Sequence, residues 1–501
     1  MRNAISRSLH IPVCAVAGAA LSLAFPKANL YPIAWFAVAP LMYYTYRLPW
    51  KQALLSGFVF GLAFFLSLLY WVGMFGLLPL VLLAVIQSLY IMAFVGLARV
   101  LGSGLGVWGR MILLPALWII AEWMSSLWIT GFPWGNTGYS QYKLLPLVQV
   151  SSATGVLGVS FLLALSNAVV ANWLTARRSR SAIAQAGVVV ALVVALWIWG
   201  SAAIVDYHVS GRPVRVAVVQ GNIRQNVPHD AAYIARISYT YGRLTQEAAD
   251  RGAKLVVWPE GVAPGCVNCD PVLLRHLTEV SEKSDGVRIL VGGRGEAGDG
   301  RTFNCAYLIG SPEGLLGTYS KVQRVPFGEF VPLRDYLPLL ARYRVMPYDV
   351  SPGPGFNVLR SGRDKIGAVI CFESAFYHIG RSLANSGAEI LCVITNDTWF
   401  GRTAAPEQHM SKSVFRAVEN RRFVLRGAVT GISCVIDPCG RMVSRAGLFE
   451  EKLLVSDVAF ISEKSFYTRH GDWLVCLSML ASLLLGATSL RARRRHPSSQ
   501  R

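Results

Sequence analysis

The chain has 501 residues, of which 53% are hydrophobic and 15% are charged, and it carries a formal net charge of +20. Soluble domains have about 25% charged residues, so the composition argues against a wholly soluble protein, and the length favours more than one domain. The positive charge does not indicate a nucleic-acid-binding protein, because the basic residues lie beside apolar stretches. Paired Cys and His at metal-finger spacing are not found in the sequence.

Long apolar stretches mark the predicted membrane helices, since a helix needs about 20 mostly apolar residues to cross a bilayer. Seven precede residue 206 and one follows residue 471, at 8–25, 30–46, 53–73, 78–98, 111–130, 152–174, 183–205 and 472–490. We therefore predict a seven-helix transmembrane domain over 1–205 and a polar domain over 206–470. A last transmembrane helix and a basic tail occupy 471–501.

Basic residues at the ends of these stretches predict their orientation, because Lys and Arg collect on the cytoplasmic side. The N-terminus, every even-numbered junction and the tail are basic, through Arg2, Arg7, Arg47, Lys51, Arg99, Arg110, Arg177, Arg178, Arg180, Arg491, Arg493, Arg494 and Arg495. With eight helices, both termini are expected in the cytoplasm and the polar domain outside it. Anchoring at the anionic inner leaflet explains the basic tail more simply than nucleic acid does.

The loop after the fifth predicted helix reads GFPWGNTGYSQYK, residues 131–143, and mixes aromatic residues with Gly and Pro. Its composition fits either an interfacial aromatic belt or a lip through which lipid reaches an active site. Glu122, near the middle of the preceding helix, is an exception in spans that otherwise have almost no charge. Intramembrane carboxylates are usually paired or functional, so we expect Glu122 to bind a lipid headgroup or to pair within the bundle.

The polar domain alternates short apolar runs with helical patterns. Runs typical of strands occur at 214–220, 254–260, 288–293, 304–310, 366–372 and 389–397. The clearest helical patterns cover 231–251 and the segment after Pro406. Strands that are apolar along their whole length are buried on both faces, so we predict an α/β domain in which helices cover a sheet.

Three reactive side chains follow such runs directly: Glu260 after KLVVWP, Lys321 after GLLGTYS, and Cys371 after KIGAVI. A thiolate can attack a carbonyl, a carboxylate can accept the thiol proton, and an ammonium can stabilise the oxyanion that forms. The residues alone leave a second interpretation open. Glu260 and Lys321 could form a structural ion pair, and Cys371 could be an inert buried residue.

Several segments together resemble the apolipoprotein N-acyltransferase family, the membrane-bound branch of the nitrilase superfamily. GLLGTYSKVQRVPFGEFVPLR (314–334) is similar to the family's lysine segment, WPEG to the segment of the base, and ICFES to that of the nucleophile. VAVVQGNI (216–223), NDTWFG (396–401) and GFPWGNTGYSQ (131–141) also match in order. VPFGE and GFPW are more specific than the triad. The resemblance implies a four-layer αββα nitrilase-like domain on a multi-pass helical membrane domain.

The resemblance also implies an activity and a place for it. An acyl chain would pass from a membrane phospholipid, through a thioester, to the N-terminal amine of an S-diacylglyceryl-cysteine lipoprotein. The protein would span the bacterial inner membrane with its catalytic domain on the periplasmic side. This chemistry requires no metal or other cofactor, and the sequence shows no nucleotide-binding loop, so the acyl group must arrive already esterified.

The resemblance also implies a role for each residue that matches a motif of the family. Cys371 would be the nucleophile, Glu260 the general base, and Lys321 the residue that stabilises the tetrahedral intermediate. The supporting residues would be Glu329 as a second acid, Phe372 through its backbone N–H in the oxyanion hole, and Glu373, which would hold the cysteine loop. Candidates for substrate binding are Phe132, Trp134, His229, Trp399 and Phe400.

The sequence departs from the family pattern at three places. Phe372 stands where a Tyr is common, His229 where a Trp is expected, and GAVTG (427–431) where an Asn-rich stretch is expected. These departures leave the triad intact and bear on acyl preference and acceptor fit.

Further polar residues have alternative interpretations. Cys266 and Cys269 could form a disulfide that braces the base loop or remain two thiols, and Cys434 and Cys439 could pair across a turn. His409 is expected at the surface or in a supporting position rather than as a ligand.

Two other functions compete with the acyltransferase. A membrane-tethered amidase would use the same triad with water as acceptor, but a tether needs only one helix. A transporter or scaffold with an inactive domain would be expected to lack a member of the triad, and spans with almost no charge also argue against transport.

Overall fold

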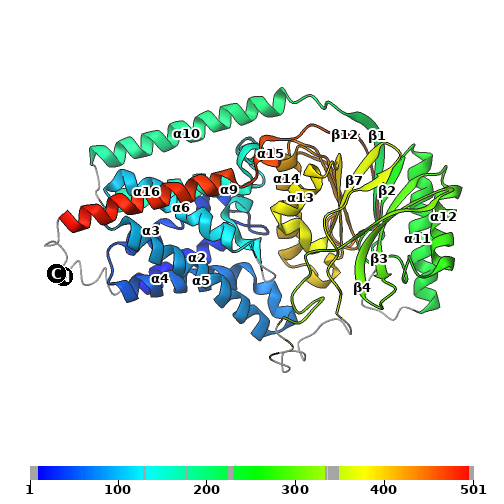
Figure 1. Cartoon of the computed structure of the whole chain (residues 1–501), viewed down its shortest axis with the longest axis horizontal. Helices are drawn as coiled ribbons and strands as arrows, with labels where there is room; N and C mark the ends of the chain where they lie inside the picture. Colours follow the sequence, from blue (N-terminus) through cyan, green and yellow to red (C-terminus); the bar gives the residue numbers. More distant parts are fainter. Residues whose placement is uncertain are drawn as a thin grey trace. The chain divides into compact units, whose positions relative to one another are not determined.

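The computed structural model describes residues 9–127, 131–175, 179–223, 230–332, 334, 336 and 349–495. The chain forms two compact units, one made of Met1–Asp206 with His470–Arg501 and the other of Tyr207–Arg469 (Figure 1). Each unit is described by itself below.

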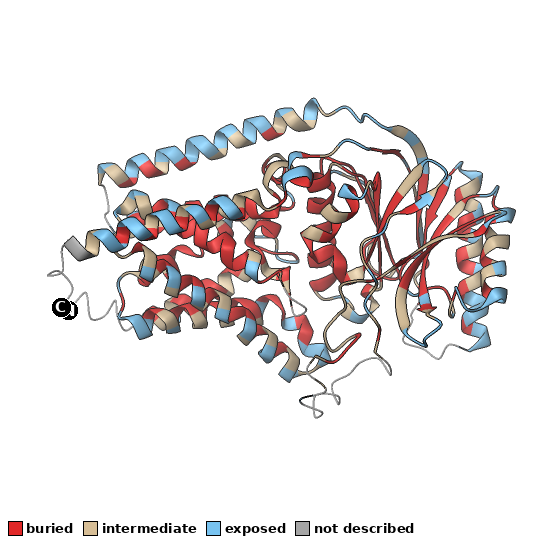
Figure 2. Ribbon diagram, in the orientation of Figure 1, coloured by how far each residue is buried: buried red, intermediate tan, exposed pale blue. Residues whose placement is uncertain are grey.

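The first unit is helical. Among the described residues, six helices are long and apolar enough to cross a membrane: α4 (Trp50–Leu68), α5 (Leu77–Gly102), α6 (Val107–Met124), α9 (Val156–Thr175), α10 (Arg180–Val205) and α16 (Trp473–Arg495). Shorter elements are α2 (His10–Ser22), η2 (Tyr70–Phe75), η3 (Pro133–Gly135), η4 (Thr137–Gln141), α7 (Leu145–Val148) and α8 (Ser151–Thr154). Figure 2 shows α10 exposed along most of its length, as expected of an apolar helix that faces lipid.

The second predicted span, 30–46, is not one continuous helix. It consists of the 3-10 helix η1 (Tyr31–Trp35) and the short helix α3 (Ala39–Thr45). Pro32 and Pro40 lie in the first turns of these elements. Proline has no N–H to donate to a preceding turn, so it starts a helix more readily than it continues one. The first predicted span is also shorter than expected, because α2 has 13 residues.

A side chain from another helix satisfies the backbone at this break. Asn167 of α9 accepts hydrogen bonds from the N–H groups of Val38 and Ala39, both at 2.8 Å, through its Oδ1. Its Nδ2 donates to the carbonyl of Ala34 at 2.8 Å. Irregular backbone at membrane depth is tolerated where neighbouring groups replace the lost hydrogen bonds.

The second unit contains two six-stranded sheets within its described part. The first has the order β12-β1-β2-β3-β4-β5, with β12 (Lys452–Phe460), β1 (Arg212–Gln220), β2 (Leu255–Val257), β3 (Arg288–Glu296), β4 (Thr302–Gly310) and β5 (Gly314–Ser320). The second has the order β11-β10-β9-β8-β7-β6, with β11 (Met442–Arg445), β10 (Cys434–Ile436), β9 (Val424–Ala428), β8 (Ile390–Thr395), β7 (Asp364–Ile370) and β6 (Leu359–Ser361).

The two sheets pack face to face, and helices cover their outer faces (Figure 1). One apolar core lies between the sheets and joins residues such as Val218 of β1 with Ile394 of β8. Helices α11 (Ala231–Asp250) and α12 (Pro271–Lys283) cover the first sheet, and α13 (Tyr377–Asn385) and α14 (Ala405–Asn420) cover the second. The short helix α15 (Phe466–His470) follows β12. This four-layer arrangement confirms the αββα fold that the resemblance implies.

Candidate active site

Cys371 lies where the parallel strand β7 ends and the short turn η6 (Cys371–Ala375) begins. Its φ is +54°, in the left-handed region that residues with a Cβ seldom adopt. Such conformations collect at functional sites because the surrounding structure must hold them. The side chain is partly exposed, so the sharp turn presents the thiol at the end of the strand.

A buried carboxylate holds this turn in place. Glu373 Oε2 accepts from the N–H of Ile370 at 2.8 Å. Its Oε1 accepts from the N–H groups of Val322 and Gln323, at 2.8 and 3.1 Å, and from the Tyr319 hydroxyl at 2.9 Å. Glu373 therefore fastens the cysteine turn to the segment that follows β5, which is the segment that carries the candidate lysine.

The lysine lies between two carboxylates. Lys321 Nζ is 2.8 Å from Glu329 Oε1 and 3.8 Å from Glu260 Oε1. Asn304 of β4 donates through Nδ2 to the same two oxygens, at 3.0 and 2.8 Å. All three charged residues are buried, so the pair of acids compensates an ammonium that would otherwise be costly to bury.

Glu260 connects this cluster to Cys371. One of its oxygens accepts from the N–H of Asn396 at 2.8 Å, and its carboxyl group lies close enough to the Cys371 thiol for each group to shift the pKa of the other. The structure thus brings Glu260, Lys321 and Cys371 together from the ends of three different strands. The carboxylate lies near both the thiol and the ammonium.

Burial and charge set the protonation of this cluster. Burial raises the pKa of the Glu260 carboxyl group, although Lys321 opposes the rise. Burial also raises the pKa of the Cys371 thiol, and the negative charge of Glu260 adds to this effect. Burial opposes the charge on Lys321, but Glu329 and Glu260 outweigh it and hold the lysine pKa above its usual range. The lysine is therefore an ammonium, and the thiol is protonated.

A second buried cluster lies next to Cys371, and no sequence motif links its members. His409 of α14 lies 2.9 Å from Asp397 Oδ1 through Nδ1, and Arg426 of β9 donates to Asp397 Oδ2 at 2.8 Å. His409 Nε2 lies 3.0 Å from the carbonyl oxygen of Cys371 and 2.8 Å from Ser374 Oγ. His409 is buried, so the prediction that it could lie at the surface is wrong, and the supporting position stays a prediction.

The proposed substrate-binding residues fall in different places. Trp399 and Phe400 lie in η7 (Asp397–Phe400), where Trp399 is 47% exposed. Phe132 and Trp134 lie in the helical unit with their rings stacked at 5.6 Å, and Trp134 also packs against Trp71. His229 lies outside the described residues.

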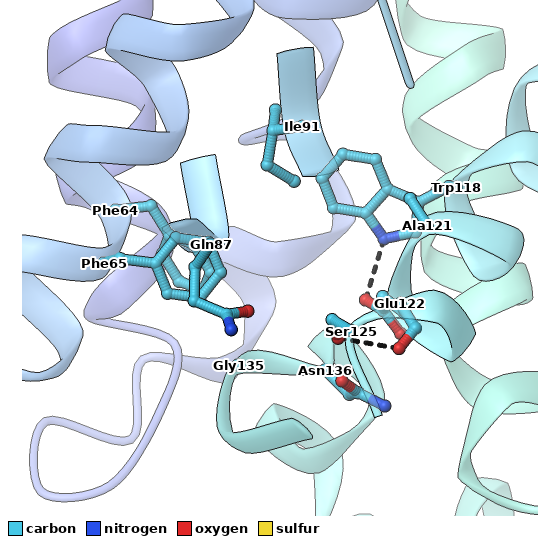
Figure 3. A pocket seen from close by; sticks show the side chains of 10 residues that line it. All are labelled: Phe64, Phe65, Gln87, Ile91, Trp118, Ala121, Glu122, Ser125, Gly135 and Asn136. Carbon is cyan, nitrogen blue, oxygen red and sulfur yellow. Dashed lines mark hydrogen bonds between the residues drawn. The ribbon is translucent and has the colours of Figure 1, made fainter. Parts of the chain in front are cut away.

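Glu122 pairs within the helical unit. Its Oε1 accepts from Trp118 Nε1 at 2.9 Å and from both the N–H and the hydroxyl of Thr137 at 2.7 Å. Figure 3 shows Glu122 and Trp118 beside a cavity that Gln87 and Asn136 also line. The cavity has a volume of about 20 Å³, which is room for a water molecule and not for a headgroup. The pairing alternative therefore accounts for Glu122, which anchors the GFPWGNTGYSQYK loop.

Cys266 and Cys269 are joined by a disulfide in the segment between Glu260 and α12. Cys434 and Cys439 are both buried and are not joined to each other, so the suggested bridge across that turn is wrong.

Comparison with known proteins identifies both units. Residues 17–169 match the apolipoprotein N-acyltransferase N-terminal domain, and residues 215–464 match the carbon-nitrogen hydrolase family. An apolipoprotein N-acyltransferase from Geobacter metallireducens is 34% identical and covers 99% of this chain and 98% of its own length. One from Nitrosomonas europaea is 31% identical and covers 95% of this chain and 96% of its own length. Among solved structures, an amidase of the nitrilase superfamily from Nesterenkonia is 20% identical, has a TM-score of 0.40, and covers 53% of this chain and 94% of its own.

The αββα unit and the cluster of acid, amine and thiol define a nitrilase-superfamily enzyme, here carried on a chain with membrane helices. The chain belongs to the apolipoprotein N-acyltransferase family, because it matches relatives of that name along nearly its whole length. It is therefore an acyltransferase and a membrane-embedded bacterial protein.

Proposed function

We propose that this chain transfers an acyl chain from a membrane phospholipid to the N-terminal amine of S-diacylglyceryl-cysteine lipoproteins, through a thioester on Cys371. Membership of the family gives the N-acylation of lipoproteins. The proposal adds a phospholipid donor, a thioester and a role for each residue of the site. The observation that supports them is the Cys371 thiol, set at a left-handed turn and beside the Glu260 carboxyl group.

In the first half of the reaction the thiol attacks the ester carbonyl of the phospholipid. Glu260 accepts the thiol proton as the S–C bond forms, and Lys321 and the backbone N–H of Phe372 stabilise the oxyanion. The tetrahedral intermediate then collapses and its C–O bond breaks. Glu260 returns the proton to the departing oxygen, so that a lysophospholipid leaves and the acyl group stays on the sulfur.

In the second half the neutral amine of the lipoprotein attacks the thioester. An N–C bond forms, the S–C bond breaks, and Glu260 carries the amine proton to the Cys371 sulfur. Glu329 keeps the Lys321 ammonium in place through both halves. It is itself held by the N–H of Val325 at 2.9 Å and by Asn304, which suits a fixed counter-charge rather than a mobile base.

We also infer that the catalytic unit lies on the periplasmic side of the inner membrane and that both termini are cytoplasmic. The number of full-length helices no longer supports this inference, because the 30–46 segment is broken. The basic residues still do, because several of them gather at one end of the helical unit. Arg99 donates to the carbonyl of Thr45 at 2.7 Å, and Arg493 donates to the carbonyl of Arg99 at 3.2 Å. A cluster of this kind is typical of the cytoplasmic face.

A transfer assay tests the proposed function. The full chain, purified in detergent, is mixed with a phospholipid labelled in its acyl chain and with a synthetic diacylated lipopeptide that has a free N-terminal amine. The expected product is the lipopeptide with a third, labelled acyl chain, found by mass spectrometry. The same lipopeptide with its amine acetylated is the matched control and should remain unchanged.

The amidase alternative makes the opposite prediction. If water is the acceptor, labelled fatty acid should appear at the same rate with either lipopeptide, and neither lipopeptide should gain an acyl chain. This result would overturn the proposal.

A further inference from the structure

The carbonyl group of Cys371 has a side-chain partner that fixes its direction. His409 Nε2 lies 3.0 Å from this oxygen. A carbonyl oxygen can only accept a hydrogen bond, so in this contact Nε2 carries the hydrogen. The same nitrogen is 2.8 Å from Ser374 Oγ, in the turn that follows the nucleophile.

The other nitrogen of the imidazole ring, Nδ1, also has close partners. Arg426 Nη2 lies 3.0 Å from His409 Nδ1 and 2.8 Å from Asp397 Oδ2. His409 Nδ1 also lies 2.9 Å from Asp397 Oδ1. When Nδ1 has no hydrogen, Arg426 donates to it, and when Nδ1 carries one, the ring is an imidazolium that also donates to Asp397. In either state Nε2 keeps the hydrogen that the Cys371 contact requires. Asp397 Oδ1 also receives the Thr395 hydroxyl at 2.9 Å. His409, Asp397 and Arg426 are all buried.

Burial and charge act on both members of this contact. Burial lowers the pKa of His409 and the neighbouring Arg426 lowers it further, while Asp397 opposes both effects. Burial favours the neutral form of Asp397, but Arg426 and His409 outweigh it, so that the pKa of Asp397 is about 2. Asp397 is therefore an anion at neutral pH, and Arg426 is paired with it.

The geometry of the peptide unit links this contact to the oxyanion hole. A peptide is planar and trans, so its C=O and N–H groups point in opposite directions within one plane. The carbonyl that His409 holds and the N–H of Phe372 belong to the same peptide. Fixing the carbonyl therefore fixes the direction of the N–H, and a hydrogen bond to the carbonyl also polarises the unit so that the N–H donates more strongly.

We propose that His409 is a positioning residue that holds the Cys371–Phe372 peptide so that the Phe372 N–H points at the oxyanion formed on the acyl donor. His409 itself does not touch the substrate. Asp397 and Arg426 fix its orientation. This inference rests on the proposed function, because it requires acyl transfer to pass through an oxyanion next to Cys371.

The test compares two reactions of the same thiol in the full chain, purified in detergent. Formation of the thioester from a labelled phospholipid needs the oxyanion hole. Alkylation of Cys371 by iodoacetamide needs the thiol and its base but forms no oxyanion. His409→Leu removes the donor, whereas His409→Gln puts an amide N–H at nearly the reach of Nε2. Thermal denaturation of each variant shows whether it is folded.

We expect the variants to change the rate of thioester formation but not the rate of alkylation. His409→Leu should form the thioester at least tenfold more slowly, since loss of an oxyanion-hole donor costs about 100-fold or more, while its alkylation rate stays within about twofold of the wild type. His409→Gln should recover most of the thioester rate. If His409→Leu does not fold, His409→Asn takes its place, because its amide reaches the position of Nδ1 but not that of Nε2.

Two results would overturn the inference. One is a thioester rate in His409→Leu or His409→Asn close to that of the wild type. The other is an equal fall in thioester formation and alkylation, which would mean that His409 supports the turn as a whole. Absence of any thioester in the wild type would instead overturn the nucleophile role of Cys371, and with it this inference.

Discussion

The Lys321 ammonium is 1% exposed and lies closer to Glu329 than to Glu260, at 2.8 Å against 3.8 Å between the nitrogen and the nearer oxygens. We therefore assign different roles to Glu329 and Glu260. Glu329 balances the buried charge of the lysine, which leaves Glu260 available for the Cys371 thiol. Proton transfer and oxyanion stabilisation can then be assigned to separate groups in one small site.

Replacing Glu329 with Gln should test this division. The change keeps the shape of the side chain but removes the counter-charge, so Lys321 should draw Glu260 into a closer pair and make it a weaker base. We expect thioester formation to fall by about 10-fold to 100-fold, because the base is weakened but not lost and a general base contributes about 100-fold to 10,000-fold in all. Glu313→Gln, at an exposed turn, is the control and should leave the rate unchanged. An unchanged rate in Glu329→Gln would contradict the assigned role.

The rate of thioester formation should depend on pH through Glu260. Burial raises the pKa of this carboxyl group above the ordinary value of about 4.3, and only the carboxylate form accepts the thiol proton. The rate should therefore fall as the pH drops through a midpoint that lies above that of an ordinary glutamate. Rapid-mixing measurements across the acidic and neutral range would show this limb. A rate that stays constant down to the ordinary value would count against Glu260 as the base.

Asp397→Asn should lower stability, because it leaves the buried Arg426 guanidinium without its anion. Breaking a buried ion pair in this way costs about 3–5 kcal/mol, and the thermal midpoint in detergent should drop clearly. Asp457→Asn removes the acid of the exposed pair with Arg215 and should change the midpoint little. Equal midpoints for the two variants would show that the buried pair is not needed for stability.

The lowered pKa of Asp397 predicts how the stability of the folded protein depends on pH. Its pKa is about 2 in the folded protein and about 3.9 in an unfolded chain. A group whose pKa is lower in the folded protein adds stability that is fully present above its pKa in the unfolded chain. This stability disappears as the pH falls through the pKa of the folded protein. For Asp397 it amounts to about 2–3 kcal/mol. Thermal midpoints measured at decreasing pH should converge for the wild type and Asp397→Asn. Parallel curves would contradict this linkage.

Asn167→Ala should destabilise the helical unit. It removes the partner of two N–H groups and one carbonyl at the break between η1 and α3, and each unsatisfied buried group costs about 1–3 kcal/mol. Asn172→Ala in the same helix removes two longer bonds, from Asn172 Nδ2 to the carbonyl of Val107 and to Gln185 Oε1, both at 3.2 Å, and should cost less. Thermal denaturation in detergent compares the two variants. A smaller effect for Asn167 would be inconsistent with its role at the break.

Local pattern was sufficient to predict much of the catalytic unit. The apolar runs that became β7 and β8 are buried on both faces, so they show as continuous apolar stretches in the sequence. Cys371 could be singled out because such a run ends directly at it. The resemblance then connected Glu260 and Lys321 to the same site, although Glu260 and Cys371 are 111 positions apart in the sequence.

The features that local pattern missed depend on distant partners. Asn167 supports a backbone break near residue 38, and nothing in the sequence around Asn167 indicates that partner. Asp397, His409 and Arg426 come from a turn, a helix and a strand, so their spacing follows no motif. The order of the strands in the sheet is what brings these three residues next to Cys371. The NDTWFG segment was a partial signal, because it placed Asp397 directly after a buried strand.

The central claim is that Cys371 carries the acyl group, and the most direct measurement is to look for it there. The full chain in detergent is incubated with a phospholipid labelled in its acyl chain, without an acceptor, and is then examined by intact mass and peptide mapping. We predict one labelled acyl group on Cys371 that hydroxylamine removes, that is absent in Cys371→Ala, and that persists in Cys305→Ala, a change at a buried cysteine of β4. Release of labelled fatty acid or lysophospholipid with no adduct on Cys371 would contradict the account.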